Sequence, residues 1–122
     1  MGYNFNTVYS VFSIAKQDKD KAAKAISELP RQPIRERLLT LEEYMTYEGW
    51  ELEIDESTGD VYSIYWTADK VRGQFDLLKA IAPFVTKGSY IQCVGESGDL
   101  WQWYFDGATC YAQTPEIIWP EN

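Results

Sequence analysis

The chain changes its sequence period at Gly49, and this change predicts two successive elements of the fold. Before the glycine, Thr40 followed by Glu43 is the pattern of a capping box, which predicts a helix over residues 41–48. Gly49 suits the left-handed position that ends a helix, because glycine has no Cβ to clash there. After Gly49, apolar and acidic residues alternate with a period of two, which predicts a strand.

This strand begins a β-hairpin with two chemically different faces. One face is apolar and the other carries carboxylates: Trp50, Leu52 and Ile54 against Glu51, Glu53 and Asp55. A Ser-Thr-Gly-Asp turn at 57–60 and an alternating return strand over 61–66 complete the hairpin. We therefore expect a half-buried hairpin with an acidic outer face.

The remaining elements predict an α+β fold. A strand is expected over 5–15, with a short helix as the alternative for that segment. A helix is expected over 18–29, a short helical segment over 34–39 and a helix from 68 to about 84, which Pro83 should end or kink. Strands follow at 89–94, 100–105 and 109–113, with a short edge strand at 117–119. Together they predict an antiparallel sheet of about five or six strands with helices packed on it, Trp101, Trp103 and Phe105 facing the helix.

The length of 122 residues predicts a single domain over 1–122. Residues 1–37 form either a semi-independent strand–helix unit or part of one shared core, and we expect the shared core. Cys93 and Cys110 fall on strands either side of 100–105. Strands two apart are separated by roughly 9–10 Å, beyond the ~7 Å Cα limit for a disulfide, which predicts two free thiols.

Charge is segregated along the chain, whose net charge is −8. Residues 1–37 carry seven Lys and Arg against four Asp and Glu, whereas residues 38–122 carry four against fifteen. An acidic surface disfavours direct binding to nucleic acid or to anionic membranes and favours basic partners. Neither a membrane-spanning apolar run nor a signal-peptide pattern occurs, so we expect a soluble cytoplasmic protein.

The residue types needed for most catalytic chemistry are missing. There is no histidine, two cysteines do not make a zinc site, and no phosphate-cradling glycine pattern is present. We predict no enzyme activity, no catalytic residues, no cofactor and no metal. Two weaker alternatives are a carboxylate pair of the glycosidase kind at Glu51 and Glu53, and a calcium site in the acidic turn at 55–60.

Residues 41–69 hold nine carboxylates and no Lys or Arg, interleaved with tyrosines and tryptophans. Such a surface suits a basic groove on another protein, with charge speeding encounter and aromatic side chains supplying affinity. The candidate partner-binding residues are Glu42, Glu43, Tyr44, Tyr47, Glu48, Glu51, Glu53, Asp55, Glu56, Asp60 and Tyr65. The alternative is that Trp50, Tyr62 and Trp66 belong to the core and the acids only coat it.

Three functions compete on these grounds. The first is a small inhibitor that binds a basic, nucleic-acid-handling protein such as a nuclease, its carboxylates standing in for phosphates in the manner of a DNA mimic. In general character the chain resembles anti-CRISPR, antirestriction and toxin-immunity proteins. The second is a small ligand-binding domain, or a carboxylate-dependent enzyme, with a pocket between helix 69–84 and the sheet. The third is a subunit that self-associates through an exposed sheet edge.

Four segments carry a further resemblance: 49–53 (GWELE), 78–84 (LKAIAPF), 88–91 (GSYI) and 101–107 (WQWYFDG). Through them, residues 41–119 resemble a group of small uncharacterised proteins of Gram-positive bacteria and their mobile elements. The resemblance covers about two thirds of the chain, omits 1–37 and brings no catalytic residues with it. It implies a mobile-element or defence setting.

Overall fold

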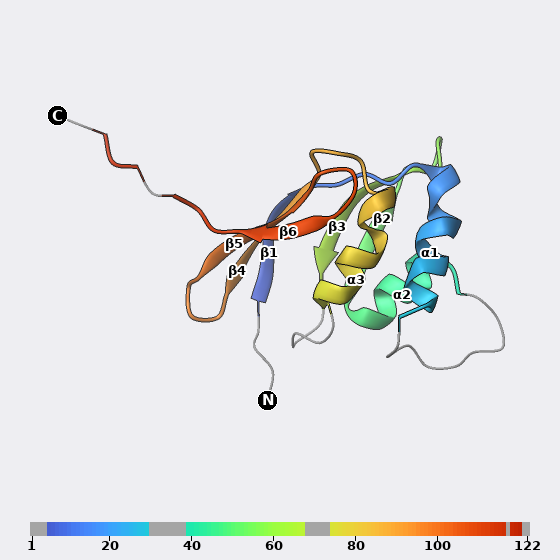
Figure 1. Cartoon of the computed structure of the whole chain (residues 1–122), viewed down its shortest axis with the longest axis horizontal. Coiled ribbons are helices and arrows are strands. Elements are labelled where there is room, and N and C mark those ends of the chain that lie inside the picture. Colours follow the sequence, from blue (N-terminus) through green and yellow to red (C-terminus); the bar gives the residue numbers. More distant parts are fainter. Residues whose placement is uncertain (1–4, 30–38, 68–73, 117, 121–122) are drawn as a thin grey trace.

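A computed structural model describes residues 5–29, 39–67, 74–116 and 118–120 of the chain. Within these residues it has three α-helices and six strands, so the predicted α+β fold is confirmed (Figure 1). The elements are β1 Phe5–Val11, η1 Lys16–Asp18, α1 Lys19–Ser27, α2 Leu41–Glu48, β2 Trp50–Ile54, β3 Val61–Trp66, α3 Gln74–Ile81, η2 Ala82–Phe84, β4 Tyr90–Gly95, β5 Leu100–Phe105 and β6 Cys110–Gln113.

The strands form two antiparallel sheets that meet along β1 and β3. One sheet has the order β1-β4-β5-β6 and the other is the β2-β3 hairpin. At their junction Ser10 Oγ donates a hydrogen bond to the Ile64 carbonyl oxygen at 2.9 Å. Beyond β1, Ile14 and Val61 exchange two backbone hydrogen bonds, of 3.2 and 2.9 Å. The single sheet expected from the sequence is therefore divided, because β1 reaches β3 through side chains and one isolated bridge instead of a continuous ladder.

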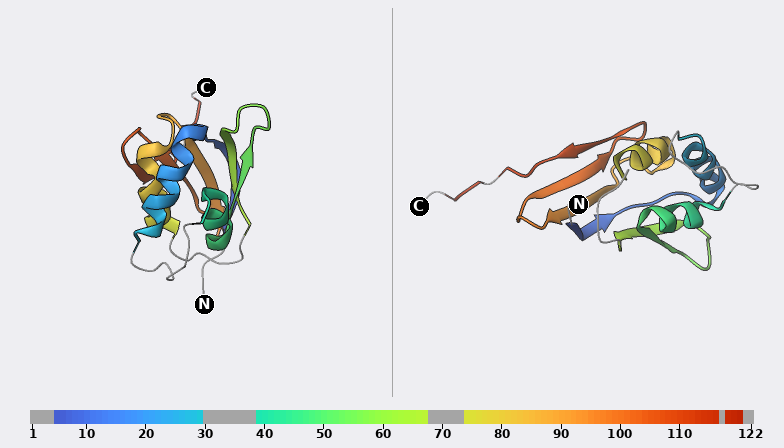
Figure 2. Two further views of the ribbon diagram at one scale, coloured as in Figure 1. Left: turned by 90° about the vertical axis from the view of Figure 1, so that its right-hand side faces the viewer. Right: turned by 90° about the horizontal axis from the view of Figure 1, so that it is seen from below.

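The helices cover one face of this curved strand array and leave the other face open (Figure 2). An aromatic cluster fills the covered side where the sheets meet. Phe5 stacks on Trp66 with ring centroids 4.7 Å apart, and Trp50 meets Trp66 edge-on at 5.0 Å. Trp101 of β5 lies 5.6 Å from Phe5, and Ile26 of α1 belongs to the same buried cluster. Residues from 1–37 thus contribute to a core that both sheets share.

Helix α2 begins and ends as its sequence predicts. Thr40 Oγ1 accepts a hydrogen bond from the Glu43 backbone N–H at 3.1 Å, and Glu43 Oε1 accepts one from the Thr40 N–H at 2.9 Å. Gly49 follows the helix with φ of 106°, a left-handed conformation. The glycine reverses the chain at once, so β2 starts at the next residue.

Several expected boundaries differ from the observed ones. The strand predicted over 5–15 ends at Val11, before the Ile14 bridge. The helix predicted to reach 84 ends at Ile81 and tightens into η2, which contains Pro83. Of the edge strand expected at 117–119, the described residues 118 and 119 are not in a strand. The start of the 68–84 helix and most of the 34–39 segment lie outside the described residues.

The strand order explains the state of the two cysteines. Strands β4 and β6 flank β5, and Cys93 and Cys110 are both free and buried, as predicted. Burial raises the pKa of the Cys93 thiol to about 12 and that of the Cys110 thiol to about 11. No helix in the described part of the chain has the length and apolar character needed to span a membrane.

Candidate functional site: the outer face of the sheets

The β2-β3 hairpin separates its apolar and polar side chains as the period of two predicts. Trp50 and Trp66 pair across the strands and are buried, which supports the alternative that they belong to the core. Glu51 pairs with Tyr65 on the opposite, outer face. Tyr62, which the same alternative also placed in the core, is instead 55% exposed, because a register shift in the hairpin leaves it without a partner across the strand.

Four side chains at or beside this outer face are at least partly exposed: Tyr47, Glu51, Glu53 and Tyr65. Glu51 Oε2 accepts a hydrogen bond of 3.2 Å from the Thr46 hydroxyl, which brings the end of α2 beside the start of β2. Glu53 is exposed two residues further along the strand. Tyr47 and Tyr65 are 47% and 43% exposed, so both phenol rings offer contact area at the surface.

The proposed role of Tyr44 as an exposed anchor is wrong. Its side chain is only 4% exposed, because Leu41, Tyr44 and Met45 lie on one side of α2 and pack into the core. Residues three and four apart share a face of a helix, so the apolar stripe includes this tyrosine. Tyr44 therefore anchors the helix and is unavailable to a partner.

Two of the helix carboxylates serve the fold itself. Glu42 forms an ion pair of 2.8 Å with Lys19 of α1, so its charge is compensated. Glu43 completes the capping box at the start of α2. Glu48 is half-buried at the last residue of the helix. The basic N-terminal part of the chain thus neutralises part of the charge of the acidic segment. The sequence does not reveal this, because the two parts are far apart along the chain.

The tip of the hairpin is organised by its own acidic residues. Asp55 Oδ1 accepts hydrogen bonds from the Ser57 hydroxyl and the Ser57 N–H, at 2.7 and 2.8 Å, and from the Thr58 N–H at 3.3 Å. These bonds hold the pKa of Asp55 below its usual value, the Ser57 hydroxyl contributing most. Asp60 Oδ1 accepts a hydrogen bond of 2.8 Å from the Lys16 N–H.

These interactions make the turn an acidic loop held by its own hydrogen bonds. Lys16 also lies directly over Gly59, which places a basic side chain at the tip. Glu56 is exposed beside them. Among the described residues, the 55–60 turn included, no three His, Cys, Asp or Glu side chains are grouped so that they could hold a metal ion.

The predicted acidic surface is therefore narrower in the structure than in the sequence. Its outward members on the hairpin are Glu51, Glu53 and Glu56, with Tyr65, while Tyr47 is exposed on the neighbouring helix α2. None of the six strands described contains Lys or Arg, so no strand places a basic side chain on this face. Lys19, Lys21 and Lys24 of α1 each form an ion pair with an acidic residue.

A second part of the outer face was missed by sequence reasoning. On the four-stranded sheet the register aligns Tyr90, Tyr104 and Tyr111 in one row across β4, β5 and β6. The rings of Tyr104 and Tyr111 have centroids 5.7 Å apart, and Tyr9 extends the row from β1 with its ring 6.2 Å from that of Tyr90. Alternation within each strand indicates which residues point outward, but the row depends on a register that one sequence does not give.

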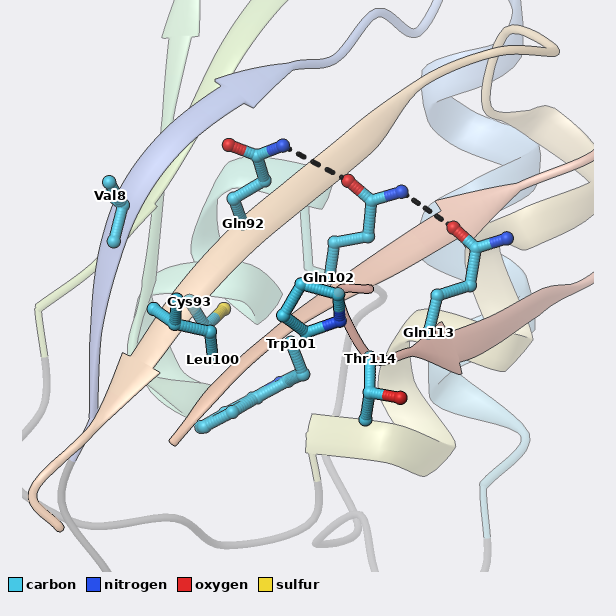
Figure 3. A pocket seen from close by; sticks show the side chains of 9 residues that line it. Val8, Gln92, Cys93, Leu100, Trp101, Gln102, Gln113 and Thr114 are labelled. Atoms are coloured by element: carbon cyan, nitrogen blue, oxygen red, sulfur yellow. Dashed lines mark hydrogen bonds between the residues drawn. The ribbon is translucent and has the colours of Figure 1, made fainter. Parts of the chain in front are cut away.

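A row of glutamines runs beside the tyrosine row. Gln92 Nε2 donates to Gln102 Oε1 at 3.1 Å, and Gln102 Nε2 donates to Gln113 Oε1 at 2.5 Å (Figure 3). Next to this row lies a pocket of about 680 Å³, a volume typical of ligand-binding clefts. Its lining is free of charged side chains and consists of Val8, Gln92, Cys93, Leu100, Trp101, Gln102, Gln113, Thr114 and Pro115.

The pocket expected between the long helix and the sheet is not found among the described residues. Leu77, Leu78 and Ile81 of α3 are at most 1% exposed and belong to the continuous core cluster, so side chains fill that space. The observed pocket lies elsewhere: Gln92, Gln102 and Gln113 of the outer face line it, together with Cys93 and Trp101, which pair on the side that faces the core.

Comparison of the chain with protein-family models, curated proteins and solved structures finds no match. The resemblance of residues 41–119 to small proteins of Gram-positive mobile elements therefore stays a prediction.

Proposed function

We propose that this chain is a protein-binding module that engages a basic surface of its partner through the outer face of the β2-β3 hairpin. The observation that carries the proposal is the placement of Glu51, Glu53 and Tyr65 on one face with no basic side chain from any described strand. The carboxylates attract a basic surface over a distance, and Tyr47 and Tyr65 supply contact area once the two proteins meet.

The proposed binding is an inhibitory one. A partner groove that holds nucleic-acid phosphates is basic, and the outward carboxylates of the hairpin occupy it in place of phosphates. This is the mode expected of an anti-CRISPR, antirestriction or immunity-type protein in the cytoplasm. It requires no cofactor and no catalysis from the chain.

The hairpin is suited to this role because its outer face can change without disturbing the core. Trp50 and Trp66 hold it from behind, while Glu51 and Tyr65 face outward. The capping box of α2 and the Asp55 turn fix the two ends of the segment. A rigid scaffold lowers the entropy lost on binding.

The experiment is capture from a cell lysate at low salt on immobilised protein, with elution by a salt gradient. We expect a captured protein to elute at moderate salt, because charge contributes strongly to its binding. Added double-stranded DNA should displace the same protein, since carboxylates and phosphates compete for one groove. A captured protein that resists both salt and DNA would contradict the proposal.

A further inference from the structure

The chain after β6 carries two large apolar side chains into solvent. Ile118 and Trp119 are 79% and 81% exposed, more than any other large apolar residue among those described. The segment leads away from the helices and sheets (Figure 1). A tryptophan buries 150–250 Å² when it finds a site, so an exposed one in a segment without secondary structure is a strong candidate for a docking residue.

The pocket on the outer face offers a site of matching chemistry. Val8 and Leu100, which are 60% and 53% exposed, provide apolar walls. The lining has no charged side chain, so an indole ring can enter the pocket without removing water from a charged group. Within the glutamine row, Gln102 Oε1 and Gln113 Oε1 already accept from neighbouring amides. Gln92 Oε1 accepts from neither of these amides, which leaves both of its lone pairs for a donor such as an indole N–H.

The same pocket lies at the root of the segment that carries Trp119. Thr114 and Pro115 are part of its lining, and the chain after β6 leads away from the sheets (Figure 1). Trp119 is four residues beyond Pro115, a reach of at most about 14 Å when extended. For Trp119 to enter its own pocket the chain would have to reverse direction within the four residues after Pro115, whose ring fixes one backbone torsion. A second molecule can receive the segment with no reversal.

The distribution of charge also favours the binding of a second copy of the chain to the outer face of the four-stranded sheet. Two molecules of net charge −8 repel, so they approach best where each surface is neutral. The tyrosine and glutamine rows are uncharged, unlike the hairpin. Tyrosine contributes well to protein interfaces. The charge pattern therefore separates two surfaces: an acidic one for a basic partner and a neutral one for another copy of the chain.

We propose that two copies of this chain form a symmetric dimer in which Ile118 and Trp119 of each copy dock in the outer-face pocket of the other. The exchange is self-complementary, as a twofold interface requires. It makes two equivalent contacts at once, and each raises the effective concentration for the other. This inference does not depend on the proposed partner of the hairpin.

Sedimentation velocity over a concentration series tests the proposal on the full chain. We expect a dimer for the unmodified protein and a dissociation constant raised by about tenfold or more for the tail variant Ile118→Ser with Trp119→Ser. The pocket variant Leu100→Glu should weaken the dimer similarly, because it places a charge in the apolar wall. Tyr62→Ser, an exposed aromatic on the hairpin, is the matched control and should leave the dimer unchanged.

Mixing the two variants distinguishes arm exchange from other interfaces. The tail variant keeps an intact pocket, and the pocket variant keeps an intact tail, so an equal mixture restores one of the two contacts. We expect the mixture to dimerise more than either variant alone, with circular dichroism showing that both are folded. A monomeric unmodified protein, a dimer that withstands both variants, or a mixture no more associated than its components would each overturn the proposal.

Discussion

Glu51 and Tyr65 stand directly opposite each other across the β2-β3 hairpin, on the face that points away from the core. Trp50 and Trp66 occupy the neighbouring pair on the buried face, with ring centroids 5.0 Å apart. Two neighbouring cross-strand pairs thus combine a buried aromatic anchor, Trp50 and Trp66, with an exposed acidic and aromatic patch, Glu51 and Tyr65. The proposed function depends on this patch, while the stability of the hairpin depends on the pair behind it.

Replacing Tyr65 separates these two roles. Tyr65→Ala should weaken binding of the captured partner by on the order of 1–2 kcal/mol, because an interfacial tyrosine loses its contact area. Unfolding in urea should change little, since the ring is substantially exposed in the free protein. Tyr62→Ala is the control from the same strand. Equal affinity for the Tyr65→Ala variant and the unmodified protein would remove Tyr65 from the interface.

The left-handed backbone at Gly49 gives a prediction about stability. Gly49→Ala should lower the free energy of unfolding by about 1–2 kcal/mol, because a Cβ is disfavoured at φ of 106°. The loss should appear as a lower urea midpoint with an unchanged slope. Gly98→Ala, at φ of 89° in the β4-β5 turn with open space around the position, provides the comparison for backbone strain alone. A Gly49→Ala variant as stable as the unmodified protein would contradict the role given to this residue.

The burial of Cys93 and Cys110 gives two predictions: both thiols are unreactive in the folded protein, and the stability of the fold decreases at alkaline pH. A thiol reagent at pH 8 should label neither Cys93 nor Cys110 in the native protein and both after denaturation, because their pKa values are raised to about 12 and about 11. The folded state favours the protonated thiols, so their contribution to stability is fully present below the ordinary thiol pKa of 9.0 and is lost as the pH rises above it.

Variants separate this alkaline effect from the titration of other groups. Cys93→Ala with Cys110→Ala should show a smaller decrease in unfolding free energy between pH 9 and pH 11 than the unmodified protein, although its stability at neutral pH is lower. Rapid labelling of either cysteine under native conditions would show that these strands open more easily than the structure indicates.

The lowered pKa values of two turn carboxylates, Asp55 and Asp106, predict that stability is also lost in acid, the opposite direction of pH from the thiols. Backbone hydrogen bonds from Thr109 and Ala108 lower the pKa of Asp106, and bonds from Ser57 and Thr58 lower that of Asp55. Their contribution to stability is present above the ordinary aspartate pKa of 3.8 and is lost as the pH falls through the lowered values. Asp55→Ala with Asp106→Ala should therefore flatten the stability profile below pH 4, measured by thermal unfolding. An unchanged acid profile would show that these turns contribute nothing.

Local features of the fold followed from the sequence where a short pattern has one structural meaning. Thr40, Glu43 and Gly49 defined the bounds of α2, and the period-two stretch after them defined the hairpin. The strand order around β5 followed from turn positions, and with it the free state of Cys93 and Cys110.

Features that depend on packing between distant segments could not be predicted from the sequence. The hairpin and the four-stranded sheet meet through Ser10 and Ile14, and nothing local marks such a junction. Lys19 pairs with Glu42 across 23 positions, which removed one acid from the predicted surface. The acidic residues around Tyr44 suggested that it is exposed, yet it lies on the apolar face of α2 and is buried in the core. The aligned tyrosine and glutamine rows required a register that only pairing in space defines.

The most direct test of the proposed function reverses the charge of the outer hairpin face. Glu51→Lys with Glu53→Lys should abolish salt-sensitive capture of the partner while circular dichroism and the urea midpoint stay close to those of the unmodified protein, since both side chains lie on the outer face. The matched control is Glu96→Lys with Glu116→Lys, an equal change of net charge at two exposed positions away from the hairpin, which should leave capture intact. Undiminished capture by the folded Glu51→Lys, Glu53→Lys variant would contradict the account.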